Sequence, residues 1–342
     1  MKIAVLAGGV GGAKFLCGVK AHLGWDPCGP APDDTDDEIT AIVNTADDIR
    51  LHGLQICPDL DSCLYTLSGQ ADIERGWGRS DETWTVSAEL SGYGAEAPWF
   101  SLGDKDIATH LMRTRMLDAG YPLSAVMAAL AHRWRPGVTL LPMSDDRVET
   151  HVVVKNPEPA ADDPAAGSMA DASAPALVAL HFQEWWVRYR AGPVPQSISP
   201  IGAAEATPAP GVLPALAEAD LILIAPSNPV VSIGTILAVP GIREALRAAP
   251  APVIAVAPLI GGSPVRGYAD RCLAAIGVES TAEAVGRHYA ARSAAGILDG
   301  YLVAEGETAE IPGVRVAVAP LLMSDAKAAA AMVAVCRDLA DV

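Results

Sequence analysis

Short, continuously apolar runs alternate along most of the chain with stretches in which apolar residues recur at the spacing of a helix. Each run is followed by a turn rich in glycine, proline, asparagine or aspartate. Strands that are apolar on both faces and alternate with helices are typical of a mainly parallel sheet that helices cover on both sides. The pattern therefore predicts a Rossmann-like α/β fold, with strands at residues 2–7, 39–44, 138–141, 221–225, 253–257 and 314–319.

The middle of the chain departs from this alternation. Residues 107–135 have the pattern of two consecutive helices joined at 120–122, and residues 150–155 and 177–190 have that of two β-strands. We expect these strands to form an antiparallel hairpin with a long connection. The predicted organisation is a nucleotide-binding core and an inserted α+β lobe, at residues 1–100 with 200–342 and at residues 101–199, respectively.

Composition excludes several classes of function. The 342 residues carry 24 Lys and Arg against 41 Asp and Glu, a formal net charge of −17. Such a chain lacks the basic surface that binds a nucleic-acid backbone or an anionic membrane. Nine of the acidic groups lie in residues 33–38 and 158–171, which have the composition of loops. About half of the excess charge is therefore predicted to be solvated loop charge.

The sequence also bears on location. No apolar run approaches the roughly 20 residues that cross a bilayer, and the first run breaks into glycines too early for a signal peptide. The six cysteines show no CxxC pair and no metal-ligand spacing. In a chain of this size we expect them to be reduced thiols, which favours a cytoplasmic protein.

A glycine-rich segment, Gly8-Gly9-Val10-Gly11-Gly12-Ala13-Lys14, directly follows the first predicted strand. Glycines let a backbone approach a phosphate closely, and the N-terminus of the next helix offers free N–H groups. The spacing is neither that of a Walker A loop nor a regular GxGxxG, and a tight turn without a ligand is the alternative. Its position in the first βα turn favours phosphate binding. The candidate residues are Gly8, Gly9, Val10, Gly11, Gly12 and Lys14.

Carboxylates follow the second predicted strand. Asp47 and Asp48 come soon after it, and Asp59 and Asp61 begin a short predicted helix, residues 59–67. Ligands bind at the carboxyl edge of a parallel sheet, and two or three carboxylates beside a phosphate loop suit a Mg²⁺ ion bridging a diphosphate. Alternatively, Asp59 is a helix N-cap and Asp61 interacts with the helix dipole.

Two further turns follow predicted strands in the C-terminal half. In the first, prolines enclose Ser227 and Asn228, whose hydroxyl and amide can hydrogen-bond a nucleotide, and Pro229 completes the turn. In the second, residues 258–267, Arg266 can offset phosphate charge. The alternatives are a structural turn capped by Asn228 and an Arg266 side chain in solvent.

Aromatic residues gather in the middle of the chain. Trp77, Trp84 and Trp99 lie among glycine-rich turns, and the segment HFQEWWV contains Gln183 and Trp185. These side chains either stack on and hydrogen-bond a flat heterocycle or pack in the core.

Other reactive residue types carry little signal. His151 and His181 lack metal-ligand spacing, so we assign them no metal role. The sequence has no nucleophile elbow and no convincing Ser-His-Asp or Cys-His arrangement. The chemistry indicated is positioning and charge neutralisation, as in phosphoryl transfer.

Seven segments resemble a known family in their order and their letters: GGVGGAKFLCG, VNTADD, HGLQICPDLDSCLYTL, GDKDIATHL, HFQEWWVRYR, APSNPVVSIGTIL and GGSPVRGYADRCL. From about Lys2 to Met323 the chain resembles the phospholactate transferases of coenzyme F420 biosynthesis, the CofD/FbiA family. The HFQEWWVRYR segment and the alanine-rich, acidic composition resemble the actinobacterial branch most, whose members use a phosphoenolpyruvate-derived donor.

The resemblance implies a transfer reaction. The terminal ribityl hydroxyl of the deazaflavin Fo would attack the β-phosphate of a GDP-linked donor, enolpyruvyl or lactyl, and GMP would leave. Family enzymes need Mg²⁺, and a homodimer is expected. Residues 8–12 and 227–229 would face the nucleotide. The residues that would supply metal ligands and a base are Asp47, Asp48 and Asp61. Those expected near the deazaflavin are Asn44, Thr45, Trp84, Gln183 and Trp185.

Two other classes of protein share parts of this pattern. A nucleotide-sugar-binding regulatory protein of a related fold would have the glycine loop and the carboxylates but no aromatic insert for a deazaflavin. A Rossmann dehydrogenase would need a regular GxGxxG and a single ribose carboxylate, and the sequence departs from both. The sequence leaves open whether the donor is enolpyruvyl or lactyl.

Overall fold

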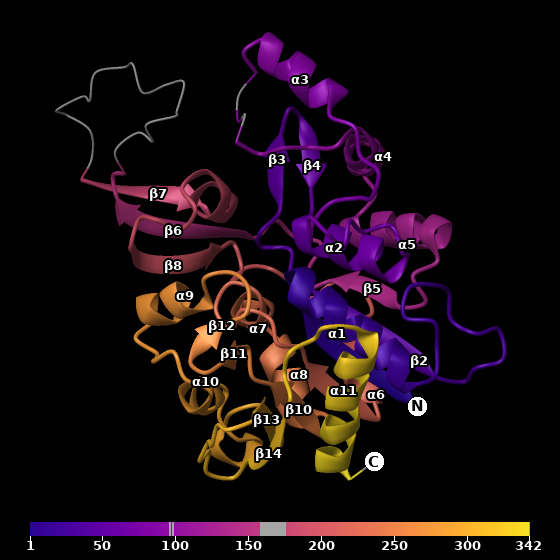
Figure 1. Ribbon diagram of the computed structural model, residues 1–342, viewed down its shortest axis with the longest axis vertical. Helices are drawn as coiled ribbons and strands as arrows, with labels where there is room; N and C mark the ends of the chain where they lie inside the picture. Colours follow the sequence, from indigo (N-terminus) through magenta and orange to yellow (C-terminus); the bar gives the residue numbers. More distant parts are fainter. Residues whose placement is uncertain (96, 98, 158–175, 342) are drawn as a thin grey trace.

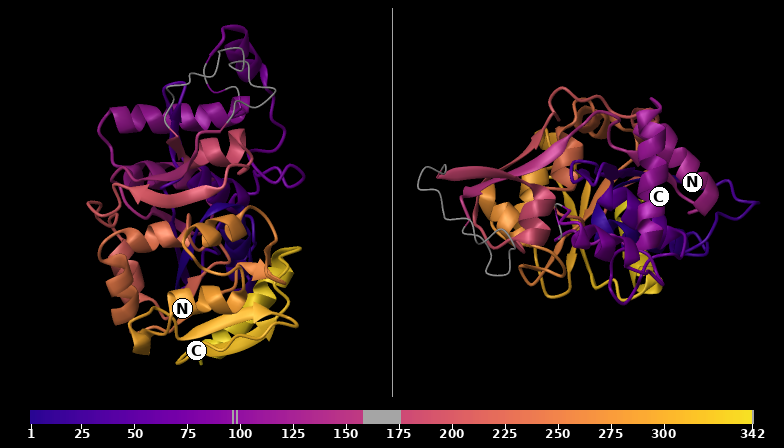
Figure 2. Two further views of the ribbon diagram at one scale, coloured as in Figure 1. Left: turned by 90° about the vertical axis from the view of Figure 1, so that its left-hand side faces the viewer. Right: turned by 90° about the horizontal axis from the view of Figure 1, so that it is seen from above.

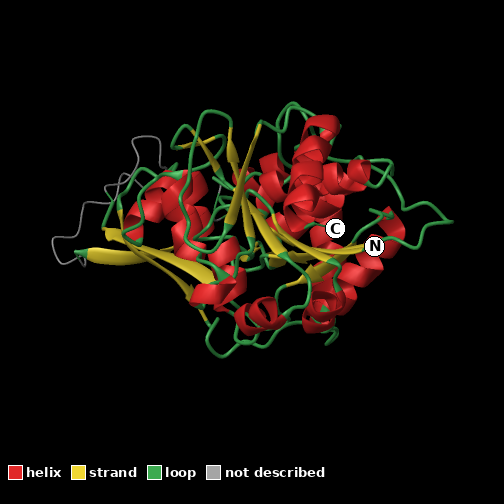
Figure 3. Ribbon diagram, turned by 90° about the horizontal axis from the view of Figure 1, so that it is seen from below, coloured by secondary structure: helices red, strands yellow, loops and turns green. Residues whose placement is uncertain are grey.

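The computed structural model describes residues 1–95, 97, 99–157 and 176–341, so the predicted acidic loop 158–171 lies outside the described residues. Its centre is a seven-stranded parallel sheet with helices on both sides (Figures 1 and 3). The strands, in their order across the sheet, are β14 (Arg315–Ala319), β13 (Gly300–Ala304), β10 (Val253–Val256), β9 (Leu221–Ile224), β1 (Lys2–Ala7), β2 (Glu38–Val43) and β5 (Thr139–Pro142).

This order is that of a Rossmann sheet with one additional strand. The chain runs outward from β1 through β2 to β5, and then returns to the other side of β1 and runs outward from β9 to β14. The side of the sheet on which the chain adds its next strand therefore changes between β1 and β9, although these two strands run parallel. Such a switch point opens a crevice at the carboxyl ends of the two strands. The predicted fold class is therefore confirmed, although the strand β13 was not predicted.

Each face of the sheet has its own set of packed helices. On one face, α1 (Gly9–His22) packs against α2 (Pro58–Leu67) and α11 (Ala326–Ala340); on the other, α6 (Val212–Glu218) and α7 (Ile233–Ala238) pack against α8 (Ile242–Ala248). A side chain at Gly18 of α1 would meet Ala329 of α11, because a Cβ there would lie 2.5 Å from the Ala329 Cβ. The strands β9 and β10 are buried throughout, which explains their continuously apolar sequences.

Residues 101–199, which we predicted to form an inserted lobe, begin with the two expected helices, α4 (Asp104–Asp118) and α5 (Leu123–Trp134). The strand β5 falls inside the range predicted for the lobe, yet it pairs with β2 in the main sheet. The lobe also contains an antiparallel sheet of three strands, in the order β7 (Leu177–His181), β6 (Glu149–Lys155) and β8 (Pro195–Ile201). Figure 2 shows this sheet beside the main one.

The strand predicted at 177–190 is wrong beyond His181. The chain turns there into a short π-helix, Glu184–Arg188. Both Phe182 and Trp185 are buried in one apolar cluster with residues of β6 and β7. Residues three apart point to opposite faces of a strand but to the same side of a helical turn, so only the helical turn buries both.

Shorter elements complete the fold. No helix among the described residues is long and apolar enough to cross a membrane, and all six cysteines are free thiols. The acidic run at 33–38 is a loop up to Asp37, and Glu38 begins β2. The remaining elements are β3 (Ile49–Leu51), β4 (Leu54–Ile56), α3 (Thr85–Gly92), β11 (Leu259–Ile260), β12 (Ser263–Pro264), α9 (Ala269–Ala275), α10 (Ala282–Tyr289) and a 3₁₀ turn (Arg292–Ala294).

Candidate active site

A cavity of about 840 Å³ opens at the carboxyl edge of the main sheet. Segments that follow β1, β2, β9, β10 and β14 all contribute to its lining, and so do α2, α4 and the turn after β7. The cavity therefore lies at the switch point between β1 and β9, where an open α/β sheet binds its ligand.

The glycine loop forms the floor of this cavity. Gly8 precedes α1 with no side-chain cap of its own, and the Gly9 N–H donates to the Asp59 carboxylate. The N–H groups of Val10 and Gly11 are therefore the ones left for an anion. A Cβ on Gly8 would lie 2.6 Å from the Ser232 Cβ, and Gly9 has a φ of +62°. These positions therefore require glycine. Gly12 is packed closely too, because its Cβ would lie 2.9 Å from that of Ala7.

The turn after β9 holds the glycine loop in place. The Gly8 N–H donates to Ser227 Oγ at 3.1 Å, and the Ser227 hydroxyl donates to the Gly8 carbonyl at 2.8 Å. Asn228 lines the cavity, and its Oδ1 accepts from the N–H groups of Val230 and Val231. Asn228 therefore caps its own turn, while Pro229 is not part of the cavity lining.

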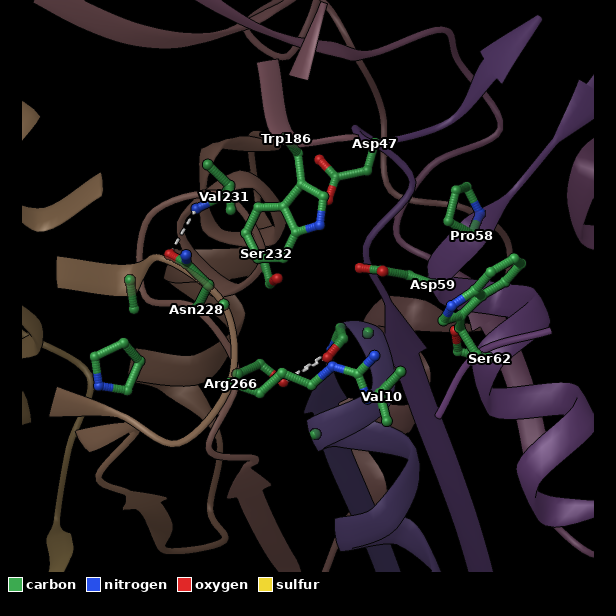
Figure 4. A pocket seen from close by; sticks show the side chains of 18 of the residues that line it. Val10, Asp47, Pro58, Asp59, Ser62, Trp186, Asn228, Val231, Ser232 and Arg266 are labelled. Carbon is green, nitrogen blue, oxygen red and sulfur yellow. Dashed lines mark hydrogen bonds between the residues drawn. The ribbon is translucent and has the colours of Figure 1, made fainter. Parts of the chain in front are cut away.

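Two carboxylates, Asp47 and Asp59, reach into the cavity from different elements (Figure 4). Beneath them, the buried side chain of Asn44 sets their spacing. Its Nδ2 donates to Asp59 Oδ2 at 3.0 Å, and its Oδ1 accepts from Ala46 N at 3.0 Å and from Thr235 Oγ1 at 2.7 Å. Asn44 was predicted to contact the deazaflavin, but its side chain does not line the cavity and instead bonds to Asp59 and Thr235.

Among the residues that the structure describes, no Lys, Arg or His forms an ion pair with Asp47 or Asp59. Burial raises the pKa of Asp59 to about 6. Burial also raises the pKa of Asp47, and the negative charges of Asp59 and Asp48 raise it further. Among the described residues, no group donates a hydrogen bond to Asp47 Oδ1. Two buried carboxylates with a free oxygen and raised pKa values form a site at which a bound cation would be favourable.

Asp48 and Thr45 lie beside this pair but do not line the cavity. Both side chains are buried. Burial raises the pKa of Asp48 well above its usual value. The structure therefore favours Asp47 over Asp48 as the carboxylate that meets a ligand.

Asp61 lines the cavity, but a buried arginine engages it. Its Oδ2 accepts from Arg113 Nη1 at 3.1 Å, and its Oδ1 accepts from Arg113 Nη2. Against the effect of burial, the charge of Asp61 raises the pKa of Arg113. With both oxygens on one guanidinium, Asp61 fits a metal ligand or a base less well than Asp47 and Asp59 do. Arg113 comes from α4, 52 residues away, and the sequence analysis did not identify it.

Further polar groups of α4 complete this part of the cavity wall. Tyr65 donates to Asp106 Oδ1 at 2.6 Å, and His110 Nε2 lies 3.3 Å from the same oxygen. Burial opposes ionisation of Asp106, but the nearby His110 ring, the hydrogen bond from Tyr65 and the charge of Arg113 lower its pKa overall.

An aromatic wall, which we define as Phe182, Gln183 and Trp186, closes the opposite side. Trp185, predicted to contact the acceptor, instead lies in the core, where its Nε1 donates to the Pro193 carbonyl at 2.8 Å. The neighbouring Trp186 points into the cavity (Figure 4).

The tryptophans of the other predicted group divide in the same way. Trp77 and Trp99 line the cavity, whereas Trp84 does not. Trp84 packs edge-on against Trp77, with ring centroids 6.0 Å apart, and the guanidinium of Arg75 lies over it. Trp84 therefore supports Trp77, which lines the cavity.

Lys14 and Arg266, both predicted to bind phosphate, line the cavity and place positive charge there. Both are exposed, and within the described part of the chain neither forms an ion pair. Figure 4 shows Arg266 extending toward Val10 at the start of α1. Cations without a protein partner beside a helix N-terminus suit an anionic ligand.

The sheet has the strand order of a Rossmann fold, and its switch point holds a glycine loop, two cationic side chains and a pair of carboxylates. These features define a nucleotide-binding α/β protein. Within that class the match is specific. The family described as 2-phospho-L-lactate transferase CofD matches residues 3–330, and this chain belongs to it. The resemblance that the motifs indicated is confirmed.

Curated relatives match over their full length. A phosphoenolpyruvate transferase from Nocardia farcinica is 56% identical over 341 residues, which cover 100% of this chain and 95% of that protein. Proteins of the same name from Mycobacterium ulcerans and Mycobacterium tuberculosis are each 55% identical, and the matches cover 100% of this chain and 99% of each relative.

Solved structures share the fold at low identity. A UPF0052-family protein from Bacillus halodurans superposes with a TM-score of 0.57 at 17% identity, covering 98% of this chain and 97% of that one. This likeness concerns the fold alone.

Proposed function

We propose that this protein is the phosphoenolpyruvate transferase of coenzyme F420 biosynthesis. The full-length identity of 55–56% to proteins of that name supports the proposal. So does the observation that carries it in the structure: Asp47 and Asp59 face one cavity beside the uncapped N-terminus of α1.

In this proposal the GDP-linked donor lies along the glycine loop, with its phosphates at the N-terminus of α1. The Ser227–Asn228 turn, Lys14 and Arg266 surround it. These groups would offset the negative charge that grows on the bridging oxygen as GMP leaves. The deazaflavin Fo lies against the aromatic wall, because Phe182 and Trp186 offer flat faces and Gln183 offers an amide.

Asp47 is the proposed base. It lines the same cavity as Trp186 of the aromatic wall (Figure 4). As a carboxylate, it can accept the proton from the ribityl hydroxyl as that oxygen attacks the β-phosphate. No covalent intermediate on the protein is needed, since the groups around the phosphates act by position and charge.

Asp59 is the proposed protein ligand of Mg²⁺. It lies beside the glycine loop, and the free oxygen of Asp47 opposite offers a second hard donor. No group of three metal-ligating side chains exists among the described residues. Mg²⁺ is commonly held by one or two carboxylates together with substrate phosphates, so the residues present fit this ion. When bound, it would supply charge neutralisation at the diphosphate.

Three finer points belong to the same proposal. The donor is the enolpyruvyl one, which the names of the relatives support. The enzyme acts in the cytoplasm, which its six free thiols favour. It forms a homodimer, as the family resemblance implies, and sedimentation velocity tests this directly.

A mass-spectrometric assay tests the proposal. The protein is mixed with Fo, Mg²⁺ and either the enolpyruvyl or the lactyl GDP-linked donor, and GMP release and product mass are followed. We expect GMP and the enolpyruvyl phosphodiester of Fo. Release with neither donor would refute the proposal, and binding of a nucleotide sugar without binding of Fo would favour a regulatory protein instead.

A further inference from the structure

We propose that His181 is a positioning residue that holds the acceptor side of the cavity in register with the catalytic carboxylate. His181 ends β7 and joins two parts of the site: the carboxylate turn, which we define as residues 44–48, and the aromatic wall. The inference rests on the proposed function, since it assigns the two sides to base and acceptor.

Both nitrogens of the His181 ring have partners. Nε2 lies 3.1 Å from the carbonyl oxygen of Asp48. A carbonyl can only accept, so Nε2 carries the hydrogen and donates. Nδ1 lies 3.1 Å from the backbone nitrogen of Gln183 and accepts from it. These partners select one neutral tautomer and fix the ring between them.

The two bonds connect residues next to the reacting groups. Asp48 directly follows Asp47, the proposed base, and Gln183 itself lines the cavity. The His181 side chain therefore couples the position of Asp47 to the position of the aromatic wall. A small shift between a base and its hydroxyl is enough to lower a rate strongly, which makes such a link consequential.

The other anchors of the carboxylate turn act elsewhere. Asn44 Oδ1 and the Thr150 N–H both bond to Ala46, at 3.0 and 2.6 Å, and so hold the middle of the turn. His181 holds its end. A third bond, from Asn44 N to the Ala7 carbonyl at 3.1 Å, holds its start. Among the described residues, none of these three bonds involves a residue of the aromatic wall.

His151 provides a matched control. It lies opposite His181 in the register of β6 and β7, and the two ring centroids are 5.8 Å apart. Its Nε2 lies 3.4 Å from Glu149 Oε2, and it does not line the cavity. A change at His151 therefore disturbs the same sheet without touching either bond of His181.

Three substitutions separate the two bonds. His181→Phe keeps a ring and removes both bonds. His181→Asn keeps an acceptor near the Nδ1 position for Gln183, and His181→Gln keeps a donor near the Nε2 position for Asp48. Each variant, with His151→Phe, is assayed for kcat and KM with Fo and the GDP-linked donor, for binding of GDP alone, and for thermal stability.

We expect His181→Phe to lower kcat/KM for Fo by about tenfold or more, and the Asn and Gln variants to lower it by about threefold each. Binding of GDP should stay within about twofold in all of them, because the glycine loop is untouched, and His151→Phe should match the wild type. If His181→Phe does not fold, the Asn and Gln variants carry the test.

Unchanged kcat/KM for Fo in the His181 variants would overturn the inference. So would a parallel loss of GDP binding and Fo turnover that tracks the unfolded fraction, since that would indicate a purely structural role. A wild-type protein without turnover in the same assay would instead refute the proposed function, so the two failures are distinguishable.

Discussion

Asp59 and Asp61 lie two residues apart on the first turn of α2, yet they belong to two different sides of the cavity. On the glycine-loop side, Asp59 and Asp47 line the cavity, neither has an ion-pair partner among the described residues, and both have raised pKa values. On the α4 side, Asp61 has both oxygens on Arg113, and Asp106 receives a hydrogen bond from Tyr65.

The difference lies in how completely each side satisfies its own charges. On the α4 side, the carboxylates of Asp61 and Asp106 already have hydrogen-bond donors within the protein. The glycine-loop side is incomplete without a cation and an anion from outside the protein, and such unsatisfied groups cluster where proteins bind and react. The same residue type therefore has a structural role on one side and a chemical role on the other.

The largest expected effect is on catalysis. Asp47→Asn or Asp59→Asn should lower kcat by roughly 10³-fold, because a base or a charge partner of the diphosphate is lost. Neither change should destabilise the fold at pH 8, since each removes a buried carboxylate that lacks a cation. GMP release and urea unfolding measure the two effects.

Asp48→Asn is the matched control for this contrast. Asp48 is buried, like its neighbour Asp47, but does not line the cavity. We expect its kcat to remain within about fivefold of the wild type. A loss as large as that of Asp47→Asn would show that the cavity-facing carboxylate has been misassigned.

On the α4 side the expected effect is on stability. Asp61→Asn leaves the Arg113 guanidinium buried without a counter-charge, which should lower the free energy of unfolding by about 3–5 kcal/mol. Asp61→Leu combined with Arg113→Met should recover much of that loss, because the pair is removed as a whole. Urea unfolding measures both variants. An Asp61→Asn protein of wild-type stability that had lost its Mg²⁺ dependence would reverse the roles of the two sides.

The sequence predicts one of these two sides better than the other. The glycine loop, Asp47 and Ser227 all follow predicted parallel strands, and the carboxyl ends of such strands meet at one edge, so their convergence could be foreseen. Arg113 is on a helix whose docking against α2 has no sequence signal. A lone arginine in a helical pattern is commonly solvated, and its burial depends on tertiary packing.

The choice between adjacent residues was also beyond the sequence. Whether Asp47 or Asp48 faces the cavity depends on the dihedral angles of the turn. Trp185 and Trp186 exchange roles because the chain leaves the strand period of two and enters a helical turn after His181. Local turns of this kind decide side-chain direction, whereas apolar periodicity predicts only the element type.

A smaller effect distinguishes the two sides by pH. Between the ordinary pKa of 3.8 and the value of about 6 for Asp59, the folded protein binds more protons than the unfolded chain. Without a divalent cation, stability should therefore fall as the pH rises through this range, by about 2 kcal/mol, and level off above about pH 7. The raised pKa of Asp47 acts in the same direction.

Urea unfolding at pH 5 and pH 7.5, with EDTA or with Mg²⁺ and GDP, measures this slope. Asp59→Asn should flatten it, and Mg²⁺ with GDP should offset it. Stability that rises with pH over the same interval in EDTA would contradict the raised pKa values.

The smallest effects come from deleting one hydroxyl on each side. Tyr65→Phe removes the donor to Asp106 and should cost about 1 kcal/mol of stability with no change in KM. Ser227→Ala removes the two bonds that hold Gly8 and should cost a similar stability. It should also raise KM for the GDP-linked donor about fivefold, because the phosphate-facing loop loses its fixed position. If both variants changed KM equally, the result would contradict binding of the donor at the glycine-loop side.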